Sequence, residues 1–220
     1  MAKAADRKPE GRTAQSLRRR PAQQRSRERV ERILAVASQK IAESGSDALR
    51  MSEVAAEAGI SIGSLYQYFP DKAAIIHTLA ARYNALCRAA IEEGLAPVKD
   101  LKSLCAAFDA LAAAYYDLFL AEPVIRDIWS GALADGRLRD LELEHSRVIG
   151  KMMTETLMRL FPKADRDEVA ARSLLVMHLG EATMRLAVSV KRKEGDALVE
   201  AYKSMAGREF TAIAARAKKG

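Results

Sequence analysis

Apolar residues recur at helical spacing along almost the whole of this 220-residue chain. They fall three or four positions apart in one segment after another, and no stretch alternates apolar with polar residues as a half-buried strand does. Ala, Leu, Arg and Glu are abundant, whereas glycine and the β-branched residues that favour strands are scarce. The pattern predicts an all-α protein with about nine helices.

Breaks in the periodicity and capping residues set the expected ends of these helices. Gly45 is a stop signal, Asp71, Asp100 and Asp165 are placed as N-caps, and Gly195 reads as the start of the last helix. The expected helices cover residues 23–43, 51–58, 62–68, 72–94, 100–120, 123–133, 138–160, 165–190 and 195–217.

The chain needs no covalent or metal support for its core. Apolar residues make up 49% of it, which is enough for a chain of this length to bury a full core. Cys87 and Cys105 belong to no CxxC pair, so they favour neither a redox motif nor a zinc ribbon, and both are expected to be small core residues. We therefore expect no cofactor.

The formal net charge of +7 is confined to the beginning of the chain. Residues 1–29 hold ten Lys and Arg against three acidic residues, so residues 30–220 are neutral overall. We expect residues 1–22 to form a basic, disordered arm that is attracted to anions. No apolar stretch of signal-peptide or membrane-spanning length follows, which favours a soluble cytoplasmic protein without a membrane partner.

Two short helices joined by a glycine turn are expected at residues 50–69. Ala55 is small enough for two helices to cross closely, and Gly59 permits the turn. A helix-turn-helix has this form because its recognition helix must be held at a steep angle to a supporting helix. By spacing alone, an ordinary helical hairpin remains an alternative.

The residues that follow the turn carry a family resemblance. Ser61-Ile-Gly-Ser-Leu-Tyr-Gln-Tyr-Phe-Pro-Asp-Lys72 resembles the signature of the TetR family of transcription regulators, and Arg25-Ser-Arg27 and Glu53-Val-Ala-Ala-Glu-Ala-Gly59 match as well. The resemblance implies a DNA-binding domain at residues 23–87 and a helical effector-binding and dimerisation domain at residues 88–220. It is specific for the first domain and rests on helix order in the second.

The resemblance also implies roles for individual residues. Base edges in the major groove would be met by Ser61, Ile62, Gly63 and Ser64, while Tyr66, Tyr68 and Lys72 would contact phosphate or fix the register. Leu65 and Phe69 would be core residues. Basic residues at the start of the first helix, here Arg25 and Arg27, would approach the DNA backbone or minor groove.

One position departs from the family pattern. Arg50 stands where the family usually has a threonine that caps the supporting helix and touches phosphate. Because arginine cannot cap an N-terminus, we expect Ser52 or Asp47 to supply part of the cap while Arg50 reaches a phosphate.

Two further patterns suggest other chemistry. Gly59-Ile-Ser-Ile-Gly63 spells the GxSxG of a hydrolase elbow, but that motif needs a strand entering the turn, and none is expected. Glu142-x-x-His145 and His178-x-x-Glu181 have the spacing of carboxylate metal sites in helical bundles. The favoured interpretation is that these are solvent-side pairs or a satisfied core histidine, with Glu181 paired to Arg185, and no metal is expected.

The second domain offers candidates for a ligand pocket and for a dimer interface. Aromatic and methionine side chains suit a pliable apolar pocket, and dimerisation follows from an operator with two half-sites. The pocket candidates are Phe108, Tyr115, Trp129, Met152, Met153, Met177 and His178. The last two helices resemble the pair that forms the family's dimer interface, with candidates Leu174, Met177, Met184, Val188, Leu198, Tyr202, Met205, Phe210 and Ile213.

The sequence thus favours a homodimeric repressor that binds a palindromic double-stranded DNA operator and is released by a small-molecule effector. The alternative is a helical interaction or structural protein whose DNA-binding domain is non-functional. An enzyme is the third and least favoured possibility.

Overall fold

The computed structural model describes residues 14–131 and 135–218, with side chains from Gln23 onward, and this part of the chain folds into helices without a strand. The expected all-α class is confirmed, and so is the expected number of helices. They are α1 (Ala14–Ser44), α2 (Met51–Glu57), α3 (Ile62–Tyr68), α4 (Lys72–Leu95), α5 (Leu101–Ala121), α6 (Pro123–Gly131), α7 (Gly136–Leu160), α8 (Arg166–Ser189) and α9 (Arg192–Ala217).

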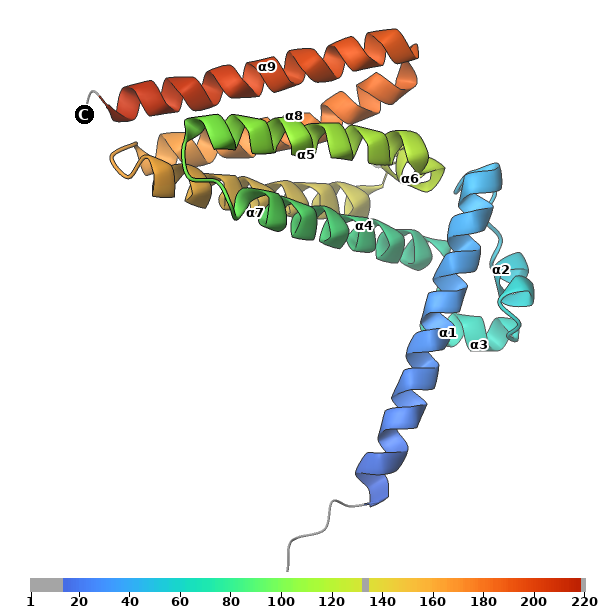
Figure 1. Cartoon of the computed structure of the whole chain (residues 1–220). Coiled ribbons are helices and arrows are strands. Elements are labelled where there is room, and N and C mark those ends of the chain that lie inside the picture. Colours follow the sequence, from blue (N-terminus) through green and yellow to red (C-terminus); the bar gives the residue numbers. More distant parts are fainter. Residues whose placement is uncertain (1–13, 132–134, 219–220) are drawn as a thin grey trace, which may run out of the picture.

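The helices form two groups that differ in direction (Figure 1). The long α1 stands upright with α2 and α3 beside its C-terminal half, and its N-terminal half extends away from the rest of the molecule. Helices α4 to α9 extend to one side of the C-terminal half of α1 in stacked layers, with α9 outermost. Helix α4 packs against α1 as well as against α5 and α7, so it belongs to both groups. The expected domain boundary at residue 87 therefore falls inside a continuous helix.

The core of the small N-terminal group is one part of a hydrophobic cluster that continues into the second group of helices. One face of α1 buries Ile33, Leu34 and Ile41, and Val54 of α2 and Leu65 of α3 pack into the same cluster with at most 2% of each side chain exposed. These are the positions at which the sequence repeats at helical spacing. Burial of aliphatic side chains of this size contributes about 1.5–3 kcal/mol each, so the core fixes the two short helices on α1.

Several helix ends differ from expectation. Helix α1 begins at Ala14 rather than at residue 23, so part of the expected disordered arm is helical, and residues 1–13 lie outside the described residues. Helix α9 begins at Arg192, and Gly195 lies within its first turn. A Cβ atom at Gly195 would lie 2.3 Å from the carbonyl oxygen of Ala187 and 2.6 Å from the hydroxyl of Tyr116. This glycine is therefore a packing requirement and not a start signal.

The two groups are joined by polar contacts at three places. The backbone N–H of Ser46, before α2, donates to Asp127 of α6 over 2.9 Å. His77 of α4 hydrogen-bonds to Asp135, the N-cap of α7, at 2.9 Å. Two guanidinium nitrogens of Arg82 on α4 donate to the Glu31 carboxylate of α1. These contacts hold α4 and α6 against the N-terminal group and α7.

Helix α5 is the one described helix that is long and apolar enough to cross a membrane by length and composition. It packs against α4, α6, α8 and α9, and it buries Leu104, Phe108, Ala112, Tyr116 and Phe119. A central helix of a soluble bundle has the same composition, because several of its sides face other helices.

Candidate DNA-binding surface and effector cavity

Helix α3 has one exposed face, and its N-terminus is capped by its own Ser61. The Ser61 side chain accepts a hydrogen bond from the backbone N–H of Ser64 at 3.1 Å, which satisfies one of the free donors at the start of the helix. Leu65 is completely buried, and this anchors the opposite face. Ile62 is 42% exposed and Tyr66 is 50% exposed, and Gly63 between them is exposed as well. Such a short helix, held by one buried leucine, leaves the predicted base-reading residues open.

Tyr68 and Lys72, both predicted to contact phosphate, also make hydrogen bonds within the protein. Tyr68 is half-buried, and hydrogen bonding to Ser26 and Arg29 on α1 lowers the pKa of its hydroxyl. The Lys72 ammonium group donates to the carbonyl oxygens of Ser46 at 3.4 Å and Asp47 at 2.9 Å. Tyr68 and Lys72 thus tie α3 and α4 to neighbouring segments, and contact with phosphate remains a prediction for both.

The expected replacement cap on α2 is wrong. Arg50 occupies the N-cap position in an extended conformation without a side-chain cap, and within the described structure neither Ser52 nor Asp47 donates or accepts a side-chain hydrogen bond at this helix end. The Arg50 side chain is 77% exposed, and among the described residues its one close acid is Glu53 at 4.0 Å. This leaves the guanidinium group accessible, as a phosphate contact requires.

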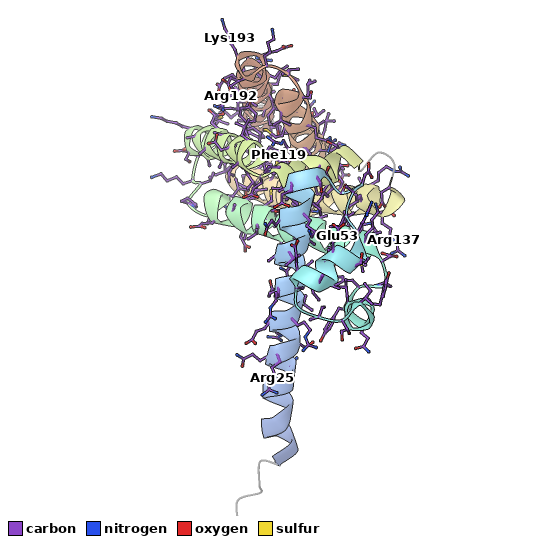
Figure 2. All side chains as sticks on the ribbon, turned by 90° about the vertical axis from the view of Figure 1, so that its right-hand side faces the viewer. Arg25, Glu53, Phe119, Arg137, Arg192 and Lys193 are labelled. Atoms are coloured by element: carbon purple, nitrogen blue, oxygen red, sulfur yellow. The ribbon has the colours of Figure 1, made fainter. Side chains whose placement is uncertain are left out.

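The acidic residues of α2 are largely neutralised. Lys40 of α1 lies 2.6 Å from Glu57 and 3.8 Å from Glu53, and the hydrogen bond that Lys40 donates to Glu57 raises the pKa of the lysine. Figure 2 shows Glu53 on this short helix and Arg25 on the extending part of α1. Arg25 and Arg27 are both exposed. Glu53 and Glu57 therefore repel DNA less than two unpaired carboxylates would.

The sequence analysis missed two exposed residues beside this surface. Gln67 lies on α3 between Tyr66 and Tyr68 and is exposed, and Arg29 lies on α1 next to the Tyr68 hydroxyl. Glutamine and arginine both have side-chain groups that can read base edges or bind phosphate. Gln67 lies four residues after Gly63 and Arg29 four residues after Arg25, and this helical spacing was the available signal.

The GxSxG sequence lies in the turn of the helix-turn-helix. Gly59 has a left-handed backbone with φ of 67°, which closes the turn after α2. Ser61 hydrogen-bonds to Ser64 as the helix cap, and a helix precedes it where a hydrolase elbow needs a strand. The motif is thus accounted for by backbone geometry.

A cavity of about 310 Å³ lies inside the second group of helices. Its wall is almost entirely apolar and comes from five helices, so a ligand within it would touch α4, α5, α7, α8 and α9 together. A volume of this size is in the range of small-molecule sites. The lining residues are Leu86, Cys87, Ala90, Ile91, Phe108, Leu111, Ala112, Ala114, Tyr115, Leu118, His145, Ile149, Met153, Met177, Gly180, Glu181, Met184 and Tyr202.

The structure separates the predicted pocket residues into two sets. Phe108, Tyr115, Met153 and Met177 line the cavity. Trp129, Met152 and His178 do not. Trp129 is 4% exposed and packs in the core from α6, Met152 is half-buried on α7, and Nδ1 of His178 contacts the Ser146 hydroxyl at 3.0 Å. The prediction for these three is wrong because helical spacing does not show which buried face meets the cavity.

Polar side chains gather at one end of this apolar cavity, on α7 and α8. Glu142 accepts a hydrogen bond from Arg185 at 2.5 Å, so the expected Glu181–Arg185 pair does not form. Nε2 of His145 lies 3.7 Å from an oxygen of Glu181, which is too far for a hydrogen bond. Within the described part of the chain, neither oxygen of Glu181 and neither ring nitrogen of His145 has a hydrogen-bond partner.

The interpretation as solvent-side pairs or a satisfied core histidine is therefore wrong for Glu181 and His145, whereas His178 hydrogen-bonds to Ser146. Glu181 is 4% exposed and His145 only 1%. Burial, with added repulsion from the Glu142 carboxylate, raises the pKa of Glu181 to about 9. Burial, with a smaller effect of Arg88, lowers the pKa of His145 to about 4. Both side chains are neutral near pH 7 in the absence of a partner.

A metal ion is the other chemistry to consider for this cluster. One ligand atom each from Glu142, His178 and Glu181 lies within 4.8 Å of the others. Glu142, however, already carries the Arg185 guanidinium group, and a positive charge that close opposes a second cation. The geometry permits a metal without requiring one.

The predicted dimer residues also fall into two sets. Met184, Phe210 and Ile213 are at most 3% exposed, and Tyr202 is 8% exposed with its hydroxyl bonded to the Val176 carbonyl, so these four pack inside the protomer. That part of the prediction is wrong. Met205 is 51% exposed, while Leu174, Met177, Val188 and Leu198 are half-buried. Helix α8 also exposes Leu175, Leu179 and Leu186, which the sequence analysis missed.

A helix-turn-helix with an exposed recognition helix, joined by one continuous helix to a bundle around an internal cavity, defines a DNA-binding transcriptional regulator. The chain belongs to the TetR family. Residues 33–79 match the family of bacterial regulatory proteins named tetR, and residues 102–214 match the tetracyclin repressor-like C-terminal domain. No curated protein sequence matches the chain.

Solved structures share the fold. A protein described as a TetR-family transcriptional regulator from Mesorhizobium loti superimposes with a TM-score of 0.67 at 17% identity, over 86% of this chain and 98% of the other. The fatty acid degradation regulator of Bacillus halodurans gives 0.60 at 18% identity, over 81% and 94%. A transcriptional regulator from Saccharomonospora viridis in complex with choline gives 0.59 at 21% identity, over 80% and 94%. At these identities the likeness concerns the fold.

Proposed function

We propose that this protein is a homodimeric repressor that binds a palindromic operator and dissociates from it when a small molecule binds in the cavity. The observation that carries the proposal is the path of α4. One end of this helix is tied to the DNA-binding group through Lys72, and the other contributes Leu86, Cys87, Ala90 and Ile91 to the cavity wall. A ligand that favours one position of α4 therefore favours one position of the recognition helix.

Two further contacts support this coupling. The Ser46–Asp127 and His77–Asp135 hydrogen bonds connect the DNA-binding group to α6 and to the start of α7. Helix α6 is therefore a second route by which a change in the bundle reaches the recognition helix. Release would follow from a changed distance between the two recognition helices, since their half-sites lie about 34 Å apart on one face of the DNA.

The homodimer is supported by an apolar stripe on α8 and α9. Leu175 is 58% exposed, Leu186 50% and Met205 51%, and Leu179 at 37% lies on the same face of α8. Exposed apolar residues that gather on one surface are typical of an interface. Two copies of this pair would make a four-helix interface about a two-fold axis.

A soluble, cytoplasmic, non-enzymatic role is the natural setting for such a regulator. DNA lies in the cytoplasm of a bacterium, and α5, despite its hydropathy, packs within the bundle. The alternative, an interaction protein with a non-functional DNA-binding domain, is disfavoured by the exposed and unobstructed face of α3.

A mobility-shift experiment with the DNA upstream of the protein's own gene tests the proposal. We expect saturable, sequence-selective binding at physiological salt. Tyr66→Phe removes one exposed hydroxyl and should weaken binding about tenfold on all sequences, whereas Thr211→Val removes an exposed hydroxyl from α9, away from this surface, and should leave binding unchanged. Absence of selective binding on this and every neighbouring promoter would favour the interaction protein.

A further inference from the structure

We infer that the cavity takes a primary amine with an apolar body, whose ammonium group is held by Glu181 and His145. The inference deepens the proposed function, because it takes the cavity as the effector site. It starts from two polar side chains that line an otherwise apolar cavity, are more than nine-tenths buried and have no hydrogen-bond partner. Buried polar groups are nearly always satisfied, so an unsatisfied pair facing a cavity indicates what a ligand supplies.

The number and kind of unsatisfied atoms select the ligand group. Glu181 offers two acceptor oxygens, and a neutral imidazole such as His145 offers one acceptor nitrogen and one N–H donor, so three of the four unsatisfied atoms are acceptors. A primary ammonium group has three N–H donors and no acceptor. A hydroxyl group has one donor and so reaches one of the three acceptor atoms, and a carboxylate has no donor at all.

The charge balance of the cluster points in the same direction. Glu142 has its counter-charge in Arg185 at 2.5 Å, whereas the Glu181 carboxylate has none of its own. An ionised carboxylate in an apolar cavity is unfavourable unless a cation joins it, so the empty site holds a proton on Glu181. An organic cation replaces that proton, and one proton leaves for each ammonium group bound.

The rest of the cavity suits the apolar body of such a molecule. Phe108 and Tyr115 of α5 and Tyr202 of α9 contribute aromatic rings to the wall. Aromatic faces attract cations as well as apolar groups, so the same wall tolerates a positively charged ligand near the polar end. The remaining wall residues are aliphatic, methionine or cysteine, which adds no competing charge.

The proton exchange predicts a distinctive dependence on pH. An amine of this kind keeps its charge below about pH 10, as lysine does. Between pH 6.5 and about 9 its affinity should rise by up to tenfold per pH unit, because less work is needed to remove the proton from Glu181. Other titratable or charged groups also face the site, so the Glu181→Gln variant is needed to assign the pH dependence of amine binding to Glu181. They are Cys87 and Arg88 of α4, Tyr115 of α5, Glu142 and His145 of α7, His178 and Arg185 of α8, and Tyr202 of α9.

The test compares two probes of the same shape, 4-phenylbutylamine and 4-phenylbutanol, by calorimetry on the full-length protein without DNA. The amine should bind at least tenfold more tightly than the alcohol at pH 8, with release of about one proton. Glu181→Gln should weaken amine binding at least tenfold, leave the alcohol within about threefold and flatten the pH profile. Glu144→Gln, an exposed carboxylate on α7, is the matched control and should change neither affinity.

Equal binding of the two probes, or a pH profile that survives in Glu181→Gln, would overturn the inference. Tight binding of Zn²⁺ that Glu181→Gln and His178→Ala both abolish would also overturn it, because the cluster would then be a metal site. A Glu181→Gln protein with an unchanged circular dichroism spectrum and alcohol affinity excludes misfolding as the cause. Because these measurements contain no DNA, their failure leaves the mobility-shift result intact, and a failed mobility shift leaves the amine site intact.

Discussion

Replacement of Arg50 by alanine gives a quantitative test of the DNA-binding surface. The Arg50 side chain is 77% exposed, its nearest acid is 4.0 Å away, and it provides no cap for α2. Each phosphate that a protein neutralises contributes about 0.9 to the slope of log affinity against log salt concentration. A homodimer carries two copies of Arg50, so Arg50→Ala should make the slope less steep by about 1.8. Between 50 and 200 mM salt, the wild-type protein should therefore lose about tenfold more affinity than the variant.

The assay is fluorescence anisotropy with labelled operator DNA over a series of salt concentrations. Arg147→Ala is the matched control, because it removes an exposed arginine from α7, in the other group of helices and away from the proposed dimer interface. An equal change of slope in both variants would mean that total charge, and not a contact at Arg50, is responsible. If Arg50→Ala leaves both the affinity and the slope of the wild type, the assignment of a phosphate contact to this residue is refuted.

Three further predictions concern the bundle. Gly195→Ala should destabilise the protein by about 3 kcal/mol in chemical denaturation because its Cβ has no room, whereas Gly207→Ala, with nothing within 4 Å, should gain about 0.5–1 kcal/mol; equal effects would contradict the packing argument. The raised pKa of Glu181 stabilises the native state below about pH 4.5, and this contribution is lost as the pH rises to about 9. Relative to Glu181→Gln, the wild type should lose up to about 1.4 kcal/mol per pH unit across that window, and parallel stability curves would exclude the shift. Leu175→Arg should yield monomers in sedimentation velocity and Val148→Arg, on an exposed face of α7, should not; a stable Leu175→Arg dimer would place the interface elsewhere.

The sequence predicted best those features that depend only on residues close together in the chain. The caps at Asp71, Asp100 and Asp165 are confirmed, because a carboxylate before an apolar repeat accepts from the free N–H groups of the helix. The helix-turn-helix is confirmed too, since Gly59 adopts the left-handed conformation that its turn requires. Gly195 was misread because the crowding that demands it comes from a residue of another helix, Ala187, which no local pattern reveals.

The cavity and the interface were less predictable for a related reason. Helical periodicity marks which side of a helix is buried, but not whether that side meets a core, a cavity or a second subunit. Trp129 looked like a pocket residue and is core, whereas Tyr202 and Met184 looked like interface residues and line the cavity. Glu181 was noticed for its spacing to His178, yet its significance lies in lacking a partner, which only the packed structure shows.

The length of α4 has a consequence for the range of molecules that can control the protein. From Lys72 to Ile91 the helix spans about 28 Å, at 1.5 Å per residue. A tilt of about 5° at the cavity therefore displaces the DNA-binding end by roughly 2 Å, and two subunits that move in opposite directions double the change in half-site separation. Operator binding thus depends on the tilt angle of α4. Chemically unrelated ligands that produce the same tilt of α4 should then have the same effect on operator affinity. A ligand that binds tightly but leaves the tilt unchanged should have none.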